Sequence, residues 1–149
     1  MAERLERPAD RLSAHVREEI DGWLAQYPPD QKRSAVLSAL HAVQHENGGH
    51  VTVEDMDAVA DYLAMPPIAV YEVGTFYSMI ETVPRARHSI SVCTNISCML
   101  CGGDDIQAHL EEKLGIRVGE STPDGRVYLK QEEECLAACC GAPMMMVDH

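Results

Sequence analysis

The sequence predicts an α+β protein with a helical first half and a small sheet in its second half. Apolar residues recur at helical spacing up to about residue 80, and after Pro84 they alternate in the short runs typical of strands. All six cysteines fall in the second half. These observations predict two domains, a four-helix bundle at residues 1–82 and a cysteine-bearing domain at residues 83–149.

Four amphipathic helices are expected in the first half, because each apolar stripe has a start or stop signal beside it. The Pro28-Pro29 pair stops the first helix, and Asp30 is expected to cap the second. Thr52 with Asp55 resembles a capping box for the third helix. Pro66-Pro67 suits the first turn of the fourth. The stripes are Leu12, Val16, Ile20, Trp23 and Leu24; Val36, Leu37, Leu40 and Val43; Met56, Val59 and Leu63; and Val70, Val73 and Tyr77.

The second half predicts a strand at residues 89–92, a helix ending at Gly115, and strands at 127–130 and 144–147. This order of strand, helix, strand and strand is typical of a thioredoxin-like sheet. We expect the run at 144–147 to be a buried strand. Ala142-Pro143, just before it, matches the cis-proline position of such folds.

Charge and composition exclude several classes of function. The net charge of −12 argues against a nucleic-acid partner and suits an acidic electron carrier or a subunit that faces a basic partner. No run approaches the roughly 20 apolar residues of a membrane span, and the first residues lack the apolar core of a signal peptide. We therefore expect a soluble protein in a reducing compartment, where cysteines serve as thiols or metal ligands.

The cysteines form two groups, each in a loop where the strand pattern stops: Cys93, Cys98 and Cys101, then Cys135, Cys139 and Cys140. Four residues separate Cys93 from Cys98, and three separate Cys135 from Cys139. A [2Fe-2S] cluster needs four thiolates, so each loop can hold one side of it. The spacing therefore favours an iron-sulfur site. Cys98 precedes the expected helix, whose N-terminal dipole would favour its thiolate.

Several alternatives remain open on spacing alone. Cys98-Met99-Leu100-Cys101 has the C-x-x-C spacing of a dithiol oxidoreductase, although that function leaves Cys93 and the second group unused. Structural zinc is a second alternative, but the second group lacks C-x-x-C spacing. Buried unreactive thiols are a third. Cys93, Cys98 and Cys101 also match the first three ligands of plant-type ferredoxins. Against that match, we expect Cys101 in the first turn of the following helix, pointing away from Cys93.

Five segments together resemble one known family. They are Met65-Pro66-Pro67, Val70-Tyr71-Glu72-Val73-Gly74-Thr75-Phe76-Tyr77-Ser78-Met79, Val92-Cys93-Thr94-Asn95-Ile96-Ser97-Cys98, Thr122-Pro123-Asp124-Gly125 and Glu134-Cys135-Leu136-Ala137-Ala138-Cys139. From about Leu12 to Val147, the chain resembles the thioredoxin-like [2Fe-2S] subunit, NuoE type, of NADH:quinone oxidoreductase, respiratory complex I.

The resemblance implies one [2Fe-2S] cluster on the two spaced cysteine pairs, namely Cys93, Cys98, Cys135 and Cys139. Cys101 and Cys140 would then be free thiols. It also implies a thioredoxin-like [2Fe-2S] ferredoxin domain after the helical bundle, and electron transfer with the FMN of a partner subunit that oxidises NADH. Neighbouring iron-sulfur subunits are further expected partners. The chain would act as a subunit of an oxidoreductase with no complete catalytic site of its own.

The resemblance leaves the parent enzyme open, since related subunits serve NAD-dependent formate dehydrogenases and hydrogenases. A complex I subunit would lie in the cytoplasm at the inner membrane, or on the matrix side, without inserting into the membrane. The chain stops at Asp148-His149, where relatives usually continue. We therefore expect a domain shortened at its C-terminus, either trimmed or naturally short.

Overall fold

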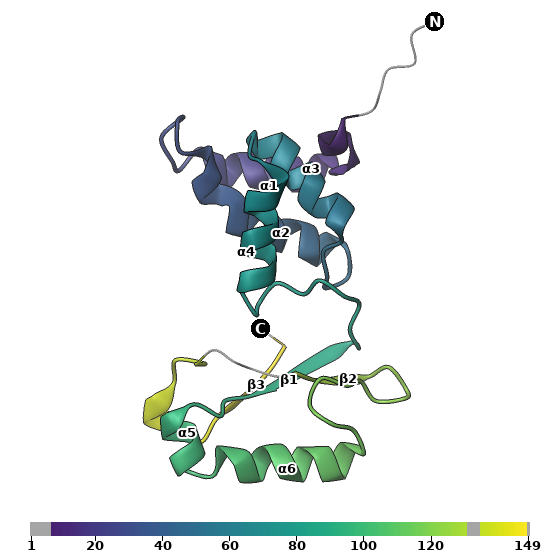
Figure 1. Ribbon diagram of the computed structural model, residues 1–149, viewed down its shortest axis with the longest axis vertical. Helices are drawn as coiled ribbons and strands as arrows, with labels where there is room; N and C mark the ends of the chain where they lie inside the picture. The colour runs from purple at the N-terminus through teal and green to yellow at the C-terminus, as the bar shows by residue number, and fades with distance from the viewer. Residues whose placement is uncertain (1–6, 131–134, 149) are drawn as a thin grey trace, which may run out of the picture. The chain divides into compact units, whose positions relative to one another are not determined.

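The computed structural model describes residues 7–130 and 135–148, so Glu134 of the fifth family segment and His149 lie outside the described residues. The chain divides into two compact units, Met1–Pro84 and Arg85–His149. Figure 1 shows helices α1 to α4 in the first unit and a small sheet with α5 and α6 in the second.

Every secondary-structure element in the described part of the first unit is a helix. Its elements are η1 (Pro8–Arg11), α1 (Ala14–Leu24), η2 (Lys32–Ala35), α2 (Val36–Glu46), α3 (Val53–Leu63) and α4 (Pro67–Phe76), where η marks a 3-10 helix. The capping box of Thr52 and Asp55 is confirmed at the start of α3, and Pro67 occupies the first turn of α4. The prediction that Asp30 caps α2 is wrong. The 3-10 turn η2 leads directly into α2, so Ala35 takes the N-cap position without a side-chain cap.

One continuous apolar core holds the helices of the first unit together. Ile20, Leu40 and Leu63, from three different helices, are at most 2% exposed. A β-carbon on Gly74 would lie only 2.9 Å from the sulfur of Met56, so α3 and α4 approach closely there. The other buried apolar members are Leu12, Val16, Ala35, Val36, Ala39, Ala42, Val43, Val51, Met56, Ala58, Val59, Ala60, Val70 and Ile80.

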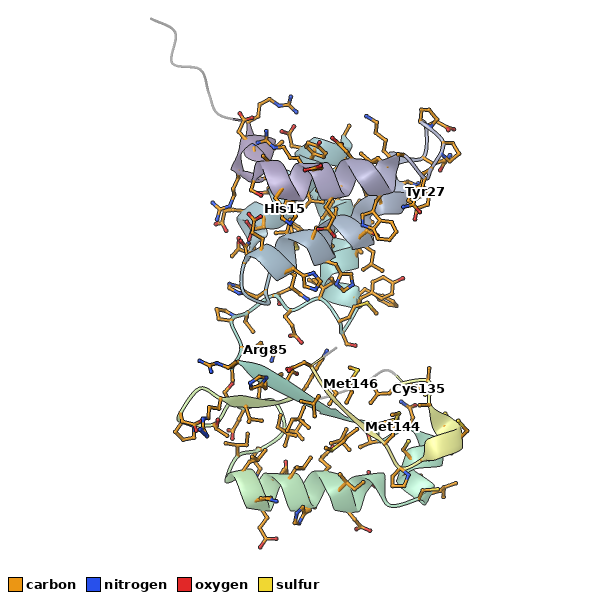
Figure 2. The ribbon with its side chains drawn as sticks, turned by 180° about the vertical axis from the view of Figure 1, so that it is seen from behind. His15, Tyr27, Arg85, Cys135, Met144 and Met146 are labelled. Atoms are coloured by element: carbon orange, nitrogen blue, oxygen red, sulfur yellow. The ribbon has the colours of Figure 1, made fainter. Side chains whose placement is uncertain are left out.

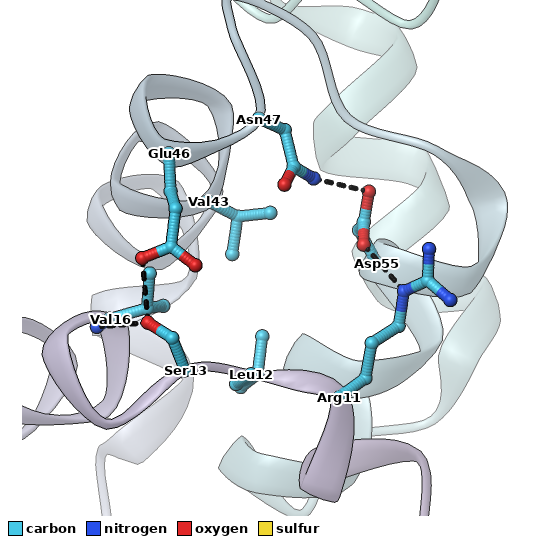
Figure 3. A pocket seen from close by; sticks show the side chains of 8 residues that line it. All are labelled: Arg11, Leu12, Ser13, Val16, Val43, Glu46, Asn47 and Asp55. Atoms are coloured by element: carbon cyan, nitrogen blue, oxygen red, sulfur yellow. Dashed lines mark hydrogen bonds and ion pairs between the residues drawn. The ribbon is translucent and has the colours of Figure 1, made fainter.

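A buried carboxylate joins the start of the chain to α2 and α3. Asp55 accepts hydrogen bonds from Arg11 Nε at 2.9 Å and from Asn47 Nδ2 at 2.7 Å, and Thr52 donates to it from both its N–H and its hydroxyl. Arg11, Asn47 and Asp55 border a cavity of about 20 Å³, which Leu12 also lines (Figure 3). Because Asp55 is only 4% exposed, these bonds replace the water that burial removes.

The second unit is a small mixed sheet with helices. Its described elements are β1 (His88–Val92), α5 (Ile96–Leu100), α6 (Gly103–Leu114), β2 (Val127–Lys130), η3 (Cys139–Gly141) and β3 (Met145–Val147). The strand order is β2-β1-β3, with β1 parallel to β2 and antiparallel to β3. Helix α6 runs along one side of the sheet (Figure 1). The predicted succession of strand, helix, strand and strand is confirmed.

Strand β3 differs from its prediction. Met145 is 43% and Val147 is 52% exposed, so the expectation of a buried strand is wrong. The reason is position, since β3 lies at the edge of the described sheet and pairs with β1 alone. The peptide bond between Ala142 and Pro143 is cis, as the sequence predicted.

Candidate metal centre

The first cysteine pair lies in the core of the second unit. Cys93 directly follows β1, and Cys98 lies within α5; each is only 1% exposed. Cys98 precedes the long helix α6, as expected, but it does not lie at the N-terminus of that helix, because the separate short helix α5 carries it and α6 begins only at Gly103. Cys101 likewise lies at the C-terminal cap of α5 and not in the first turn of α6.

The second cysteine pair lies in and before η3. The sulfur atoms of Cys135 and Cys139 are 3.7 Å apart, and both residues are exposed. A tetrahedral metal with metal–sulfur bonds of about 2.3 Å holds its sulfur ligands about 3.8 Å apart. The pair is therefore already spaced as two ligands of one tetrahedral iron.

The two pairs meet at one end of the sheet. The Cys93 thiol hydrogen-bonds with the thiols of both Cys98 and Cys135, and Cys98 lies close enough to Cys139 to interact with its charge. In Figure 2 the labelled Cys135 and Met144 lie at the same end of the second unit as α5. The structure thus gathers all four of the predicted ligands, from two loops that are about forty residues apart in the sequence.

Backbone N–H groups surround these sulfurs. Leu136 and Asn95 donate to the sulfur of Cys93, and Met144 donates to that of Cys98. Ala137 donates to Cys135 at 3.3 Å. Sequence reasoning missed the parts played by Leu136, Asn95 and Met144, because a backbone donor leaves no side-chain signal.

Burial and hydrogen bonding move the thiol pKa values in different directions. The N–H of Leu136, followed by that of Asn95, lowers the pKa of Cys93. Burial, together with the hydrogen bond to Cys93, raises the pKa of Cys98, so the expected thiolate-favouring dipole does not set the net direction there. For Cys135, the Ala137 N–H lowers the pKa, but the bond to Cys139 and burial outweigh it and the pKa is raised.

The donor set fits a two-iron cluster. Four cysteine sulfurs arranged as two pairs provide two ligands for each iron, and the N–H donors can stabilise the negative charge of an iron-sulfur centre. Within residues 7–130 and 135–148, no three His, Cys, Asp or Glu side chains are grouped in a way that would hold a single metal ion. A binuclear cluster does not require such a group, because each iron takes only two protein ligands.

The two remaining cysteines lie on the surface. Cys101 and Cys140 are both exposed, and all six cysteines are free thiols in the structure. Cys98, the proposed dithiol partner of Cys101, is buried and hydrogen-bonded to Cys93. The geometry therefore groups Cys98 with Cys93, Cys135 and Cys139.

A small mixed sheet with four cysteines converging from two loops at one end defines a thioredoxin-like protein with a sulfur-ligated metal centre. The family model described as thioredoxin-like [2Fe-2S] ferredoxin matches residues 20–149 of the sequence. The chain belongs to this family.

Relatives with known names match most of the chain. It is 45% identical over 132 residues to the second E-type subunit of the NADH-quinone oxidoreductase of Rhizobium meliloti (strain 1021), covering 89% of this chain and 76% of that one. It is 42% identical over 139 residues to the E-type subunit of the same enzyme from Rickettsia conorii, covering 93% of this chain and 81% of that one. Identity to the mitochondrial NADH dehydrogenase [ubiquinone] flavoprotein 2 of Dictyostelium discoideum is 39%, covering 87% of this chain and 52% of that one.

A solved structure supports the fold. The NAD+-reducing [NiFe]-hydrogenase in its H2-reduced state matches with a TM-score of 0.60 at 19% identity, covering 75% of this chain but only 18% of that one. The likeness extends to the fold alone. Among the described helices, none combines the length and the apolar character needed to cross a bilayer.

Proposed function

We propose that this chain is the [2Fe-2S] electron-transfer subunit of an NADH-quinone oxidoreductase. The observation that carries the proposal is the convergence of four cysteine sulfurs at one end of a thioredoxin-like sheet, in a chain of this family. Its relatives of 42–45% identity, which it covers over most of their length, are subunits of that enzyme. The chain contributes to an oxidoreductase without carrying the NADH site itself.

We propose Cys93, Cys98, Cys135 and Cys139 as the ligands of one cluster. When bound, the cluster accepts and releases single electrons. The chain's own residues hold it: the buried pair, Cys93 and Cys98, keeps water from one side, and the backbone N–H groups of Leu136 and Met144 point at the sulfurs. All-cysteine ligation is expected to give a low reduction potential, on the order of −400 to −150 mV.

We further propose that the partner is the subunit that binds FMN and oxidises NADH, with other iron-sulfur subunits nearby. Such a complex would place the chain on the cytoplasmic side of the inner membrane, or on the matrix side, without its entering the bilayer. We interpret residues 1–82 as a four-helix bundle domain and residues 83–149 as the cluster domain. The shared core of α1 to α4 supports the first of these.

Two measurements test this function. Protein reconstituted anaerobically with iron and sulfide should hold about two of each per chain, and on reduction should give a rhombic S = 1/2 EPR signal. Tagged chain purified from its host should carry a flavoprotein, and NADH should reduce the cluster in that assembly. Colourless protein after reconstitution, or a cluster that NADH never reduces in the purified assembly, would refute the proposal.

A dithiol oxidoreductase that uses Cys98 and Cys101 is the second candidate, because Cys101 is exposed and lies three residues from Cys98. The substitution Cys101→Ser separates the two functions. It should leave iron content and the EPR signal unchanged, whereas a dithiol enzyme would lose turnover. An equivalent subunit of a formate dehydrogenase or hydrogenase would show NAD-linked reduction of its cluster by formate or H2 in the purified assembly.

A further inference from the structure

One alanine beside the candidate metal centre has an unusual backbone conformation. Ala137 lies between Cys135 and Cys139 and has a φ of 59°, in the left-handed region that residues other than glycine enter at a cost. Such strained residues persist where the surrounding contacts fix them, and they gather at functional sites. The contacts of this turn show what Ala137 positions.

Two successive N–H groups of the turn reach two different cysteine sulfurs. The N–H of Leu136 donates to the sulfur of Cys93, which belongs to the first cysteine loop. The N–H of Ala137 donates to the sulfur of Cys135, in the second loop, at 3.3 Å. Successive N–H groups that point into one concavity are typical of anion sites, iron-sulfur centres among them. One turn therefore donates hydrogen bonds to ligands from both loops.

The left-handed conformation makes two features of the turn compatible. The φ angle of a residue sets the direction of its own N–H relative to the chain that follows. With φ at 59°, the Ala137 N–H points back to Cys135 while the chain continues to Cys139, whose sulfur lies 3.7 Å from that of Cys135. At a negative φ, the hydrogen bond and this sulfur spacing could not both be kept.

A second alanine with positive φ provides a comparison within the chain. Ala64 has a φ of 55° at the C-terminal cap of α3, and its N–H bonds to the carbonyl groups of Ala60 and Asp61. A left-handed residue is common where a helix ends. Ala137 has no such explanation, because η3 begins only after it, at Cys139.

We propose that Ala137 is a positioning residue for electron transfer. Its left-handed backbone holds its own N–H on the sulfur of Cys135, and this hydrogen bond raises the reduction potential of the cluster. The proposal rests on the function proposed above. Reduction adds one electron, which the flavoprotein partner supplies, and an N–H donor stabilises the reduced state more than the less negative oxidised state.

Replacing one backbone amide by an ester tests the hydrogen bond itself. Cys135 permits native chemical ligation, so residues 1–134 can be joined to a synthetic segment 135–149 with L-lactic acid in place of Ala137. The methyl group stays and the N–H is removed. After reconstitution with iron and sulfide, the equilibrium constant for reduction should be about tenfold lower than in the ligated wild type, a potential about 59 mV lower. An unchanged potential would overturn the proposal.

Ala137→Val tests the backbone conformation. It keeps the N–H, but its β-branched side chain disfavours a positive φ, so the potential should fall in the same direction as in the ester chain. The matched control is Ala64→Val, because Ala64 is also exposed and left-handed, and it should leave the potential unchanged. A normal potential in Ala137→Val, or an equal shift in Ala64→Val, would contradict the assignment.

Ala137→Gly is the conservative replacement. Glycine keeps the N–H and takes a φ of 59° without strain, so the equilibrium constant for reduction should stay within about twofold of the wild-type value. A fall like that of the ester chain would overturn the proposal. So would loss of the cluster from both the ester chain and Ala137→Val with normal loading of Ala137→Gly, since the residue would then serve binding and not the potential. If the wild-type chain itself holds no cluster, the proposed function fails instead.

Discussion

The two units of this protein are stabilised by different interactions within each unit. In the helical unit, residues from α1, α2, α3 and α4 bury a continuous apolar core. In the sheet unit, the buried apolar residues of the described part are few: Val92, Cys93, Cys98, Ile116, Tyr128 and Leu129. Two of these six are candidate ligands. Apolar burial can stabilise the first unit alone, whereas the second unit is expected to depend on its cluster.

The largest expected effect comes from removing one ligand of the buried pair. Cys98→Ser should abolish the cluster, with bound iron falling more than about tenfold and the S = 1/2 signal lost, since a [2Fe-2S] centre needs all four thiolates. Helical circular dichroism from the first unit should persist. The matched change Cys101→Ser should leave the cluster intact. Loss of the cluster in Cys101→Ser as well would shift the ligand set toward the plant-type pattern, in which both residues are ligands. Retention of the cluster in Cys98→Ser would contradict the assignment of Cys98 as a ligand.

The second largest effect is expected from removing the metal, which should destabilise the sheet unit and leave the helical unit unchanged. Chelation under reducing conditions should speed amide hydrogen exchange in residues 88–130 by about 100-fold, because ligand binding no longer favours the folded form. The rates of amide hydrogen exchange in α2 and α3 should change less than about twofold on chelation, since their core contains no ligand. Equal acceleration in both units would show that the helical core also depends on the cluster.

A substitution in the apolar core should destabilise the helical unit and leave the cluster unaffected. Leu40 is 0% exposed in α2, and Leu40→Ala should lower the free energy of unfolding of the helical unit by about 3 kcal/mol. Ile68→Ala, at a 64% exposed site in α4, is the control and should cost less than about 0.5 kcal/mol. Iron content should be normal in both variants. Reduced cluster loading in Leu40→Ala alone would mean that the units are not energetically independent.

The smallest expected effect concerns pH. Burial raises the pKa of Asp55, but hydrogen bonds from Thr52 and Arg11 outweigh it, so the pKa is lowered from its ordinary value of 3.8. The ionised form thus contributes stability above that value, which is lost as pH falls through the lower folded-state pKa. Urea unfolding of the helical unit between pH 6 and 2 should show a loss of about 1 kcal/mol in the wild type. Asp55→Asn should remove this part of the acid sensitivity, and an unchanged pH profile would contradict the assignment.

The helices were predictable because their signals are local. The capping box of Thr52 and Asp55 and the proline at the start of α4 each act within one turn of helix, so sequence spacing alone reveals them. The start of α2 was mispredicted, because Asp30 is a good capping residue but the chain makes a 3-10 turn before the helix begins. The prediction relied on the local capping preference of Asp30, which the folded chain does not use.

The sheet unit shows the limit of local signals more clearly. The apolar run after Pro143 predicted a strand at 144–147, but it could not show that Met145 and Val147 lie at an exposed edge. Exposure depends on which strands pair, and pairing joins residues far apart in the chain. The same limit applied to α5, because a single turn of helix carries too short a pattern to be separated from α6.

By itself, the sequence determined the α+β class, the order of the strands and of the longer helices, and the grouping of the cysteines in two loops, because periodicity and spacing are properties of short stretches. The set of four ligands came from the family resemblance. Only the tertiary structure decided how those cysteines are surrounded. Cys93 receives an N–H from Leu136 and Cys98 receives one from Met144, across more than forty residues of chain in each case. Such contacts form only when the sheet brings its two loops together, and no local pattern encodes them.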